Sequence, residues 1–295
     1  MDLHDVKDIA VLGAGSMGHQ IAMLCALGGF STTIYDIQEP ALEKAKENLE
    51  FQMGKWIQKG KISKEALEEA FARLSYTTNL EEAVRNTDFV IEAVVEKLDV
   101  KRNLFAAVDR LAPAHAILAS NSSTIASSKI ADVTSRPEKV CNMHFFFPAL
   151  VMDCVEVVMS DTTSQETADV TLAVCEKIKR TGVLLRKETW GFVANRLLFA
   201  LNKEALKLYE EGICDYKDID IIVKKSLNHP LGPFELMDLS GIDVGYYALE
   251  EKYKETGNIE DKPPVSLEEK VNAGTLGRKT GKGWYEYKGA GVKVK

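Results

Sequence analysis

Short apolar runs alternate with segments of helical spacing along the first part of the chain. The apolar runs predict β-strands at residues 9–12, 89–94, 116–119, 140–144 and 155–158, with a further run that ends at Asp36. Between these runs, apolar residues recur three and four positions apart, which is typical of amphipathic helices. They predict one helix that begins at Met17. Five further helices are predicted over residues 40–60, 64–74, 100–111, 127–133 and 166–181. Because strands and helices alternate, we expect an α/β domain around a parallel sheet.

The pattern changes after Trp190 and Gly191. Segments of helical spacing follow one another at residues 192–212, 216–227, 233–239 and 241–256, and strand-like alternation returns only in the last few residues. A chain of 295 residues is also longer than a typical single domain. We therefore predict an α/β domain over residues 1–187 and an all-helical domain over residues 188–295.

Three glycines follow the first predicted strand in the spacing G-x-G-x-x-G. They are Gly13, Gly15 and Gly18, with Ser16 and Met17 between the last two. Gly13 permits a tight turn, Gly15 lets the backbone approach a pyrophosphate, and Gly18 lets the following helix pack closely on the sheet. The N-terminus of that helix favours an anion. The stretch predicts a Rossmann-type dinucleotide site, and the alternative is a tight turn that binds nothing.

Asp36 identifies the dinucleotide. It stands at the end of the second predicted strand, where a carboxylate accepts hydrogen bonds from both ribose hydroxyls of an adenosine. A phosphate on the 2′ position would be repelled by this charge. A neighbouring basic residue would admit NADP, but no Arg follows Asp36 directly. We therefore expect the cofactor to be NAD.

Composition excludes several classes of partner. Hydrophobic residues make up 45% of the chain and charged residues 27%, as in ordinary globular proteins. The net charge of −7, from 37 basic and 44 acidic residues, leaves no basic surplus for a nucleic acid. The N-terminal residues lack the order of a secretory signal, and no apolar run approaches the roughly 18 residues that span a bilayer. We expect a cytoplasmic protein with neither nucleic-acid nor membrane partners.

The five cysteines are scattered and never form a C-x-x-C pair; they stand at positions 25, 141, 154, 175 and 214. We expect them to be reduced, buried and to pack as small apolar side chains. Their spacing therefore predicts neither a metal site nor a disulfide framework.

Three polar residues fall near predicted strand ends, where open α/β sheets bind their ligands. They are Ser123, His144 and Glu156. Oxidation of an alcohol by NAD requires a group that removes the hydroxyl proton, and imidazole suits this task when a carboxylate holds its other nitrogen. His144 and Glu156 are candidates for this pair. The alternative is a structural histidine and a strand glutamate paired elsewhere.

Seven motifs in one order strengthen this interpretation: GAGSMG, SNSST, HFFFP, VEVV, GFVANRLL, PLGPFELMDLSGID and GRKTGKGWYEY. With them the chain resembles the L-3-hydroxyacyl-CoA dehydrogenase family over almost its whole length. The resemblance implies an NAD-binding domain followed by a helical domain that usually forms a dimer interface, so we expect a homodimer. It implies reversible oxidation of an (S)-3-hydroxyacyl-CoA to the 3-oxoacyl-CoA.

The resemblance also implies roles for individual residues. The catalytic histidine of the family falls on His144 and its glutamate partner on Glu156. Ser123 and Asn195 fall on residues that contact the reacting oxygen. From the residues alone, Asn195 is equally a helix-surface amide, and Ser123 a helix cap before Ile125.

Two further groups of residues gain a meaning from the resemblance. Glu96 and Lys101 follow the E-A-V-x-E strand, where the family contacts the cofactor; a surface ion pair is the alternative. Lys55, Lys59 and Lys61 form a basic cluster where the family recognises the CoA phosphates, and the alternative is a solvated helical face.

The sequence departs from the family at three positions. Phe147 replaces the amide of H-F-F-N-P, Leu150 replaces a proline, and Trp190 replaces the proline of T-P-G-F. Lost polarity and added aromatic surface change what fills an acyl pocket. We therefore expect an acyl group other than simple butyryl, either branched, cyclic or aromatic, or a shortened pocket.

Two other functions remain as alternatives. One is a dehydrogenase of a free hydroxy acid, of the sugar-acid or carnitine type, which would not need the lysine cluster. The other is an NAD-binding protein without catalysis, which would not need Ser123, His144, Glu156 and Asn195 together.

Overall fold

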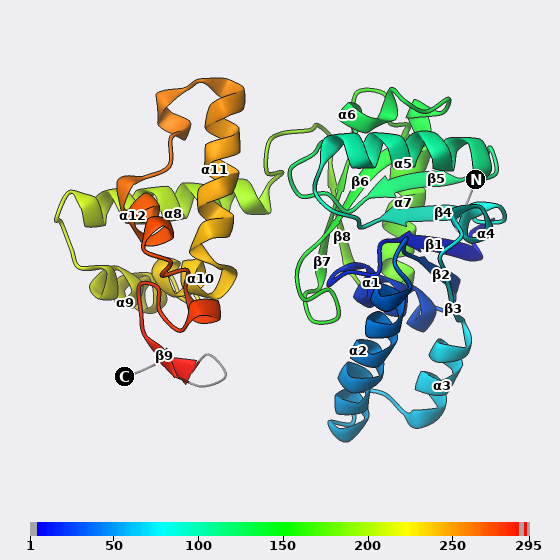
Figure 1. Cartoon of the computed structure of the whole chain (residues 1–295), viewed down its shortest axis with the longest axis horizontal. Coiled ribbons are helices and arrows are strands. Elements are labelled where there is room, and N and C mark those ends of the chain that lie inside the picture. Colours follow the sequence, from blue (N-terminus) through cyan, green and yellow to red (C-terminus); the bar gives the residue numbers. More distant parts are fainter. Residues whose placement is uncertain (1–4, 289–291, 294–295) are drawn as a thin grey trace. The chain divides into compact units, whose positions relative to one another are not determined.

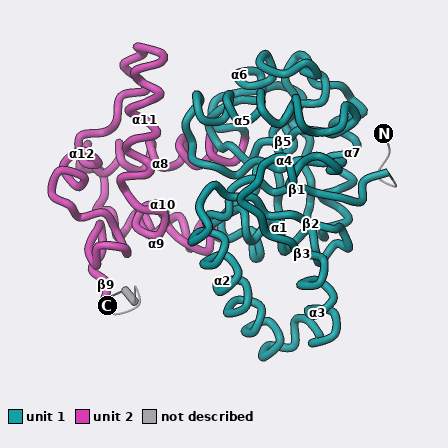
Figure 2. The backbone as a smooth tube through the Cα atoms, turned by 45° about the vertical axis from the view of Figure 1, so that its right-hand side comes forward, with its two compact units in different colours: residues 1–192 teal, residues 193–295 magenta. Residues whose placement is uncertain are grey.

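The computed structural model describes residues 5–288 and 292–293 of the chain (Figure 1). Two compact units are formed by residues 1–192 and 193–295 (Figure 2). This division and the predicted one after residue 187 both lie in the connection between strand β8 (Thr181–Leu185) and helix α8 (Ala194–Glu210).

An eight-stranded sheet forms the centre of the first unit. Its other strands are β1 (Asp8–Leu12), β2 (Ser31–Tyr35), β3 (Leu74–Thr77), β4 (Phe89–Glu92), β5 (Ile117–Ser120), β6 (Val140–Phe145) and β7 (Cys154–Val158). They lie in the order β3-β2-β1-β4-β5-β6-β7-β8, and neighbours are parallel except β6 and β7. The six strands from β3 to β6 have the Rossmann order. Chain order runs outward in opposite directions from β1 and β4, so the switch point of this order lies between these two strands.

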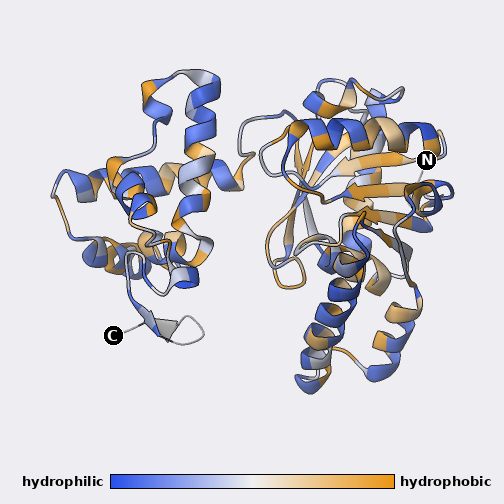
Figure 3. Cartoon of the chain, in the orientation of Figure 1, coloured by the Kyte–Doolittle hydropathy of each residue, from blue (hydrophilic) through white to orange (hydrophobic). Residues whose placement is uncertain are grey.

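Helices cover both faces of this sheet. They are α1 (Gly18–Leu27), α2 (Glu39–Gln58), α3 (Lys64–Ala72), α4 (Leu80–Val84), α5 (Leu98–Leu111), α6 (Ser128–Ala131) and α7 (Gln165–Lys177), with a 3-10 turn at Pro137–Lys139. Within β1, Ile9 and Val11 belong to the core shared with α1, α2 and α7, whereas Ala10 and Leu12 belong to the core shared with α5. Because both of their faces are buried, the central strands β1, β4 and β5 are mainly apolar (Figure 3).

At both edges of the sheet the structure differs from the elements that the sequence predicts. The spacing predicts a helix over residues 166–181, but α7 ends at Lys177, Lys179 adopts a left-handed φ of 57°, and Thr181 begins β8 beside β7. The predicted helix over residues 64–74 ends at Ala72, and Leu74 begins β3 beside β2. The sheet is also mixed, because β7 runs antiparallel to β6. These short strands are stabilised by pairing with a neighbour, which local periodicity does not report.

The second unit is helical apart from short segments near its end. Beyond α8 it contains α9 (Tyr216–Ser226), α10 (Pro233–Ser240), α11 (Ile242–Thr256) and α12 (Val265–Asn272), 3-10 turns at Ile259–Asp261 and Arg278–Thr280, and the paired strands β9 (Tyr287–Lys288) and β10 (Val292–Lys293). Its core packs Phe234 against Trp284, with ring centroids 4.6 Å apart. Buried Asp238 accepts hydrogen bonds from the backbone N–H groups of Trp284 and Tyr285, which fixes the GKGWYEY segment on α10.

All five cysteines are free thiols. Cys25, Cys141 and Cys175 are buried, as expected, whereas Cys154 and Cys214 are only half-buried because they lie near the surface of their units. In the part of the chain that the structure describes, no helix is long and apolar enough to cross a membrane, and no group of three or more metal-ligating side chains converges.

Replacement of Phe89 by Ala is expected to destabilise the first unit by about 3–5 kcal/mol, because the Phe89 side chain is fully buried in β4 and its loss leaves a cavity. Phe51→Ala on the exposed side of α2 removes the same side chain at 65% exposure and should cost less than about 1 kcal/mol. Urea unfolding followed by circular dichroism measures both. Equal losses would contradict the assigned position of the core.

Candidate active site

The glycine loop lies where the strand order of the sheet reverses, between β1 and β4. Gly13 has a φ of 105°, and a Cβ atom on it would lie 2.6 Å from the carbonyl oxygen of Ala93, just beyond β4. A Cβ on Gly18 would lie 1.7 Å from the carbonyl oxygen of Gly13. These two positions accept only glycine, because side chains there would separate α1 from the sheet.

Gly15 is different, because it faces open space. A Cβ atom on Gly15 would meet nothing within 4 Å, and both Gly15 and Ser16 are exposed. Met17, the N-cap residue of α1, makes no side-chain cap hydrogen bond. The loop therefore presents bare backbone at the start of α1, which is the arrangement that a pyrophosphate requires.

Asp36 joins this loop from the end of β2. Its Oδ2 accepts a hydrogen bond from Ala14 N at 2.9 Å, and its Oδ1 accepts one from Gln38 N at 3.0 Å. Each carboxylate oxygen has two acceptor sites, so both retain capacity for a ribose hydroxyl. The residues of this edge of the sheet therefore fit a dinucleotide with an unmodified ribose.

His144 and Glu156 form a buried pair. They are directly opposite each other in the antiparallel register of β6 and β7, and His144 Nδ1 lies 2.9 Å from Glu156 Oε2. In the tautomer that donates Nδ1–H to the carboxylate, Nε2 is unprotonated. The pair can therefore accept a proton from an alcohol at Nε2 and stabilise the imidazolium that results.

Aromatic side chains surround the imidazole. The ring centroid of His144 lies 4.6 Å from that of Phe146 and 5.6 Å from that of Phe192. Phe192 is buried with a left-handed φ of 51°, a conformation that costs a non-glycine residue about 1–3 kcal/mol. Phe147 is 65% exposed and precedes a cis peptide bond to Pro148. The imidazole thus lies near the rings of Phe146 and Phe192, and the chain reaches the surface at Phe147.

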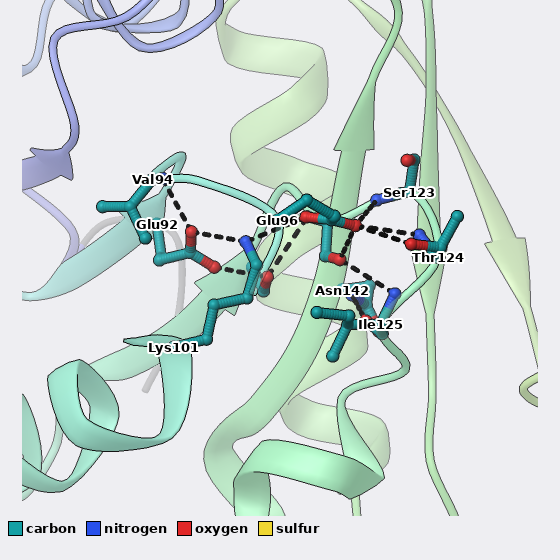
Figure 4. Close-up of polar contacts among 10 residues, drawn as sticks. Glu92, Val94, Glu96, Lys101, Ser123, Thr124, Ile125 and Asn142 are labelled. Carbon is teal, nitrogen blue, oxygen red and sulfur yellow. Dashed lines mark hydrogen bonds and ion pairs between the residues drawn. The ribbon is translucent and has the colours of Figure 1, made fainter. Parts of the chain in front are cut away.

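The loop after β5 carries Ser123 and is held by one carboxylate (Figure 4). Glu96 Oε1 accepts hydrogen bonds from Ser123 N and Thr124 N, both at 3.1 Å, from Thr124 Oγ1 at 3.0 Å, and from Ser122 Oγ. Burial alone would raise the pKa of Glu96, but the Lys101 ammonium and the hydrogen bonds from the loop outweigh burial and lower this pKa. The Ser123 side chain points away from the ionised carboxylate (Figure 4).

The ion pair expected on the surface is buried at its lysine end. Lys101 lies in the first turn of α5 with a side chain only 1% exposed. Its Nζ is 2.7 Å from Glu92 Oε1 and 3.1 Å from Glu96 Oε2. Glu92 is fully buried at the end of β4, and its contact with Lys101 holds the ammonium group inside the unit.

The geometry has counterparts in known proteins. Residues 8–189 match the family model described as the NAD-binding domain of 3-hydroxyacyl-CoA dehydrogenase, and residues 191–287 match that of its C-terminal domain. The chain belongs to the 3-hydroxyacyl-CoA dehydrogenase family. It is therefore an NAD-dependent oxidoreductase of 3-hydroxyacyl-CoA thioesters, which confirms the fold, the cofactor and the reaction that the motifs imply.

Individual members of the family are similar over their full lengths. A probable 3-hydroxybutyryl-CoA dehydrogenase of Bacillus subtilis is 38% identical over 283 residues, which cover 96% of this chain and 98% of that protein. The crystal structure of (S)-3-hydroxybutyryl-CoA dehydrogenase from Ralstonia eutropha superposes with a TM-score of 0.91 at 34% identity, covering 97% of this chain and 100% of that one. A diketoreductase structure gives a TM-score of 0.85 at 32% identity, covering 96% and 99%.

Residues that the family resemblance singled out lie in both units. Asn195 is half-buried in the first turn of α8, in the helical unit. Lys55 lies in the last turn of α2, Lys59 is the C-cap residue of this helix and Lys61 follows it; all three are exposed, in the dehydrogenase's NAD-binding unit. The Lys55 ammonium lies 3.8 Å from the ring centroid of Phe51. The cluster is thus a solvated helix end with positive charge available to a phosphate.

Two side chains that hold the loops of the site in place were not predicted from the sequence. Gln20 donates to the carbonyl oxygen of Ser16 at 2.9 Å and accepts from Leu150 N at 3.2 Å, which joins the cofactor loop to the segment after β6. Asn121 accepts from Phe145 N at 2.9 Å and joins the serine loop to β6. Polar residues that interrupt an apolar element near a strand end are the signal that would identify them.

The cap before Ile125 is also reassigned. Ser122 Oγ accepts a hydrogen bond from Ile125 N at 2.9 Å, whereas Ser123 contributes its backbone N–H to Glu96. The capping function therefore belongs to Ser122, because its side chain points into the turn, and the alternative in which Ser123 is a cap before Ile125 is wrong.

Gly15→Ala is expected to weaken NADH binding about tenfold or more without loss of stability, because the new methyl group occupies only the open space in front of the loop. Fluorescence titration with NADH and a thermal melt measure the two effects. Gly54→Ala in α2, which also meets nothing within 4 Å, is the matched control and should leave NADH affinity unchanged. Unchanged affinity in Gly15→Ala would remove this loop from the cofactor site.

Proposed function

We propose that His144 is the general base that removes the hydroxyl proton of an (S)-3-hydroxyacyl-CoA. The observation that carries this proposal is the 2.9 Å contact between His144 Nδ1 and Glu156 Oε2, which leaves Nε2 as the proton acceptor. Glu156 holds the tautomer and stabilises the imidazolium. In the reverse direction the imidazolium returns the proton to the 3-oxo group. Bound NAD⁺ supplies the acceptor for the hydride that leaves C3.

Ser123 and Asn195 position the reacting oxygen in this proposal. Ser123 stands on a loop fixed through its backbone, so its hydroxyl can serve a ligand. Asn195 brings an amide from α8 that can donate to the same oxygen. Both groups hold the alcohol in the geometry for proton and hydride departure, and neither needs to titrate.

The cofactor would be held by the glycine loop, Asp36 and the end of β4. Gly13 and Gly18 shape the turn, while Gly15, Ser16 and Met17 line the approach to the pyrophosphate; the open space at Gly15 supports this role. Asp36 would accept from the adenosine ribose. Glu96 and Lys101, which form an ion pair beyond the end of β4, would both contact the cofactor.

The lysine cluster would bind the phosphates of CoA. Lys55, Lys59 and Lys61 are exposed within one short stretch, and their positive charge contrasts with a chain of net charge −7. An ammonium group binds a phosphate as a point charge without fixed geometry. The cluster is suited to bind the phosphates that every acyl-CoA carries.

The acyl group would be larger or more rigid than butyryl. The segment after His144 exposes Phe147 at 65%, Val151 at 67% and Met152 at 43%. Exposed apolar side chains in the segment that follows the proposed base favour a ligand that buries them, such as a branched, cyclic or aromatic acyl chain. A pocket shortened by Phe147 is the other form of this proposal.

We also infer a homodimer located in the cytoplasm. The helical unit exposes large apolar side chains, namely Leu197, Ile213, Ile221, Ile222, Val244 and Tyr247. A self-complementary interface would bury such residues. The five free thiols are in keeping with a reducing compartment.

A dehydrogenase of a free hydroxy acid, of the sugar-acid or carnitine type, is the second candidate. It is favoured by the similarity to a diketoreductase and by the apolar Phe147. A third candidate, an NAD-binding protein without catalysis, is disfavoured because the buried His144 and Glu156 pair has no evident structural need for an imidazole.

Rapid oxidation of NADH with a 3-oxoacyl-CoA is the expected result of the first assay. Acetoacetyl-CoA, a 3-oxoacyl-CoA with an aromatic acyl group and free acetoacetate are compared by absorbance at the NADH maximum. Activity highest with the aromatic ester supports a bulky acyl group, whereas a preference for acetoacetyl-CoA refutes that form of the acyl proposal and favours the shortened pocket. His144→Ala should lose about 10²–10⁴-fold in kcat while it still binds NADH. Activity with free acetoacetate alone would select the second candidate.

Charge reversal of the lysine cluster separates CoA esters from free acids. The variant Lys55→Glu, Lys59→Glu, Lys61→Glu should raise KM for a 3-oxoacyl-CoA about tenfold or more, because it removes attraction for the phosphates, and should leave kcat within about twofold. Steady-state kinetics at low and high salt measure the change, which salt should reduce. Reversal of Lys252 and Lys254 on α11 is the control. An unchanged KM would show that the cluster is a solvated surface.

A further inference from the structure

A pocket of about 950 Å³ lies in the helical unit, and the proposed reaction does not use it. Its walls come from α8, α9, α12 and the GKGWYEY segment, so all of them belong to the unit of residues 193–295 (Figure 2). The GKGWYEY segment supplies five successive residues, Lys282 to Glu286. A pocket of this volume is large enough for a small organic molecule.

The lining of this pocket is strongly basic. Among the described residues that form it, four are lysines and one is a glutamate, so the lining carries a formal charge of +3 in a chain of net charge −7. Two lysines have carboxylate partners, since Lys224 Nζ lies 2.8 Å from Glu235 Oε1 and Lys282 Nζ lies 3.4 Å from Glu286 Oε1. The other two are Lys217 and Lys270. Because like charges repel each other at short range, the pocket is suited to an anion.

Lys270 has the most unusual surroundings of the four lysines. It is half-buried, its Nζ donates to the carbonyl oxygen of Gly283 at 3.0 Å, and this ammonium lies 4.5 Å from the ring centroid of Trp284. Burial lowers the pKa of Lys270, and the charge of Asp238 offsets this effect only in part. Over the described part of the chain, no carboxylate lies within 4 Å of its Nζ. A desolvated ammonium group without a counter-ion favours an anionic ligand.

Aromatic rings form the other part of the pocket wall. The ring centroid of Trp284 lies 5.2 Å from that of Tyr209 and 5.7 Å from that of Tyr216, and the Tyr216 centroid lies 5.2 Å from that of Tyr285. Tyr209 and Tyr216 are only half-buried. Such rings stack with planar heterocycles of any sequence. A phosphate ion alone would use the ammonium groups but would leave the rings and most of the volume empty.

The wall of the pocket is held in a single conformation. Buried Asp238 accepts hydrogen bonds from the N–H groups of Trp284 and Tyr285, both at 2.9 Å, and Asp220 accepts one from the Tyr285 hydroxyl at 2.8 Å. A Cβ atom on Gly283 would lie 2.0 Å from Asp238 Oδ1, so this close approach requires glycine. A pocket that is already formed binds a ligand without the cost of ordering its wall.

We propose that this pocket binds a nucleotide, with its phosphates at the ammonium groups of Lys217 and Lys270 and its base against the rings of Tyr209 and Tyr216. The site is additional to the NAD site and to the lysine cluster proposed for CoA, both of which lie in the first unit. It does not rest on the proposed function, because none of its residues has a role in the reaction.

The test is a calorimetric titration of the full chain with ATP. Saturating NADH and the background Lys55→Glu, Lys59→Glu, Lys61→Glu keep the glycine loop and the first lysine cluster from supplying the signal. In this background, Lys217→Gln combined with Lys270→Gln should raise the Kd for ATP about tenfold or more, because two charge-assisted contacts are lost. Lys270→Arg retains the charge and should bind within about threefold. An unchanged Kd in the double variant would overturn the proposal.

Two exposed lysines outside the pocket supply the matched control. Lys207 lies on α8 and Lys225 on α9, and neither lines the pocket. Lys207→Gln combined with Lys225→Gln removes the same charge from the same unit and should leave the Kd within about twofold. A loss equal to that of the pocket variant would mean that the charge of the unit as a whole attracts ATP, which would also overturn the proposal.

Fragments of the nucleotide test its two parts. ATP should bind about tenfold or more tightly than inorganic triphosphate, because only ATP carries a base that stacks on the rings. It should exceed adenosine by a similar factor, because adenosine lacks phosphates. Triphosphate that binds as tightly as ATP would overturn the nucleotide and leave a simple anion site, whereas equally tight adenosine would exclude the lysines.

A thermal melt covers failure of the variants to fold. ATP should raise the Tm of the parent protein and leave that of the double variant unchanged. Gln at position 270 retains a donor for the carbonyl oxygen of Gly283, so this variant should fold. If it does not, Lys217→Gln alone decides, since Lys217 is exposed and its loss should still raise the Kd about threefold. An unchanged Kd in this single variant would then refute the site.

Discussion

The hydrogen-bond register of the central sheet determines where every reactive side chain of the first unit lies. Parallel pairing of β1, β4, β5 and β6 brings their carboxyl ends to one edge, which gathers the glycine loop, Glu92, the serine loop and His144. Strand β7 pairs antiparallel with β6, and this pairing sets Glu156 opposite His144. A slip of one residue between β6 and β7 would move Glu156 to the other face, so the hydrogen-bonded pair of His144 and Glu156 exists only in this register.

Burial of polar groups is the main energetic compromise of this fold. The sheet is apolar on both faces, yet Glu92, Lys101, His144 and Glu156 are buried at or near its carboxyl edge. Each of them is paired with an opposite charge or a hydrogen-bond partner, which offsets its desolvation. Such paired groups contribute less to stability than apolar packing, but they hold side chains in one orientation. The unit thus combines an apolar core that stabilises with a polar edge that orients.

The aromatic side chains near the imidazole leave its pairing intact, since His144 and Glu156 keep their hydrogen bond. Phe146 and Phe192 pack near the imidazole, whereas Phe147 is exposed. Proton transfer and acyl recognition need different atoms, so an exposed ring can bear on a bound acyl group without altering the pair.

The amino-acid sequence predicted the Rossmann unit, the helical unit and NAD, because glycine spacing, apolar runs and an acid at a strand end are local signals. It offered His144 and Glu156 only as candidates for a pair, and the antiparallel register of β6 and β7 brings the two side chains together. Local signals failed for β3 and β8, whose edge positions depend on a partner strand. They also failed for Lys101, which reads as a surface residue next to Glu96. Only the tertiary structure places buried Glu92 within 2.7 Å of that ammonium, because the contact joins the end of one strand to the helix that follows it. Charge burial depends on three-dimensional neighbours, and periodicity along the chain does not encode them.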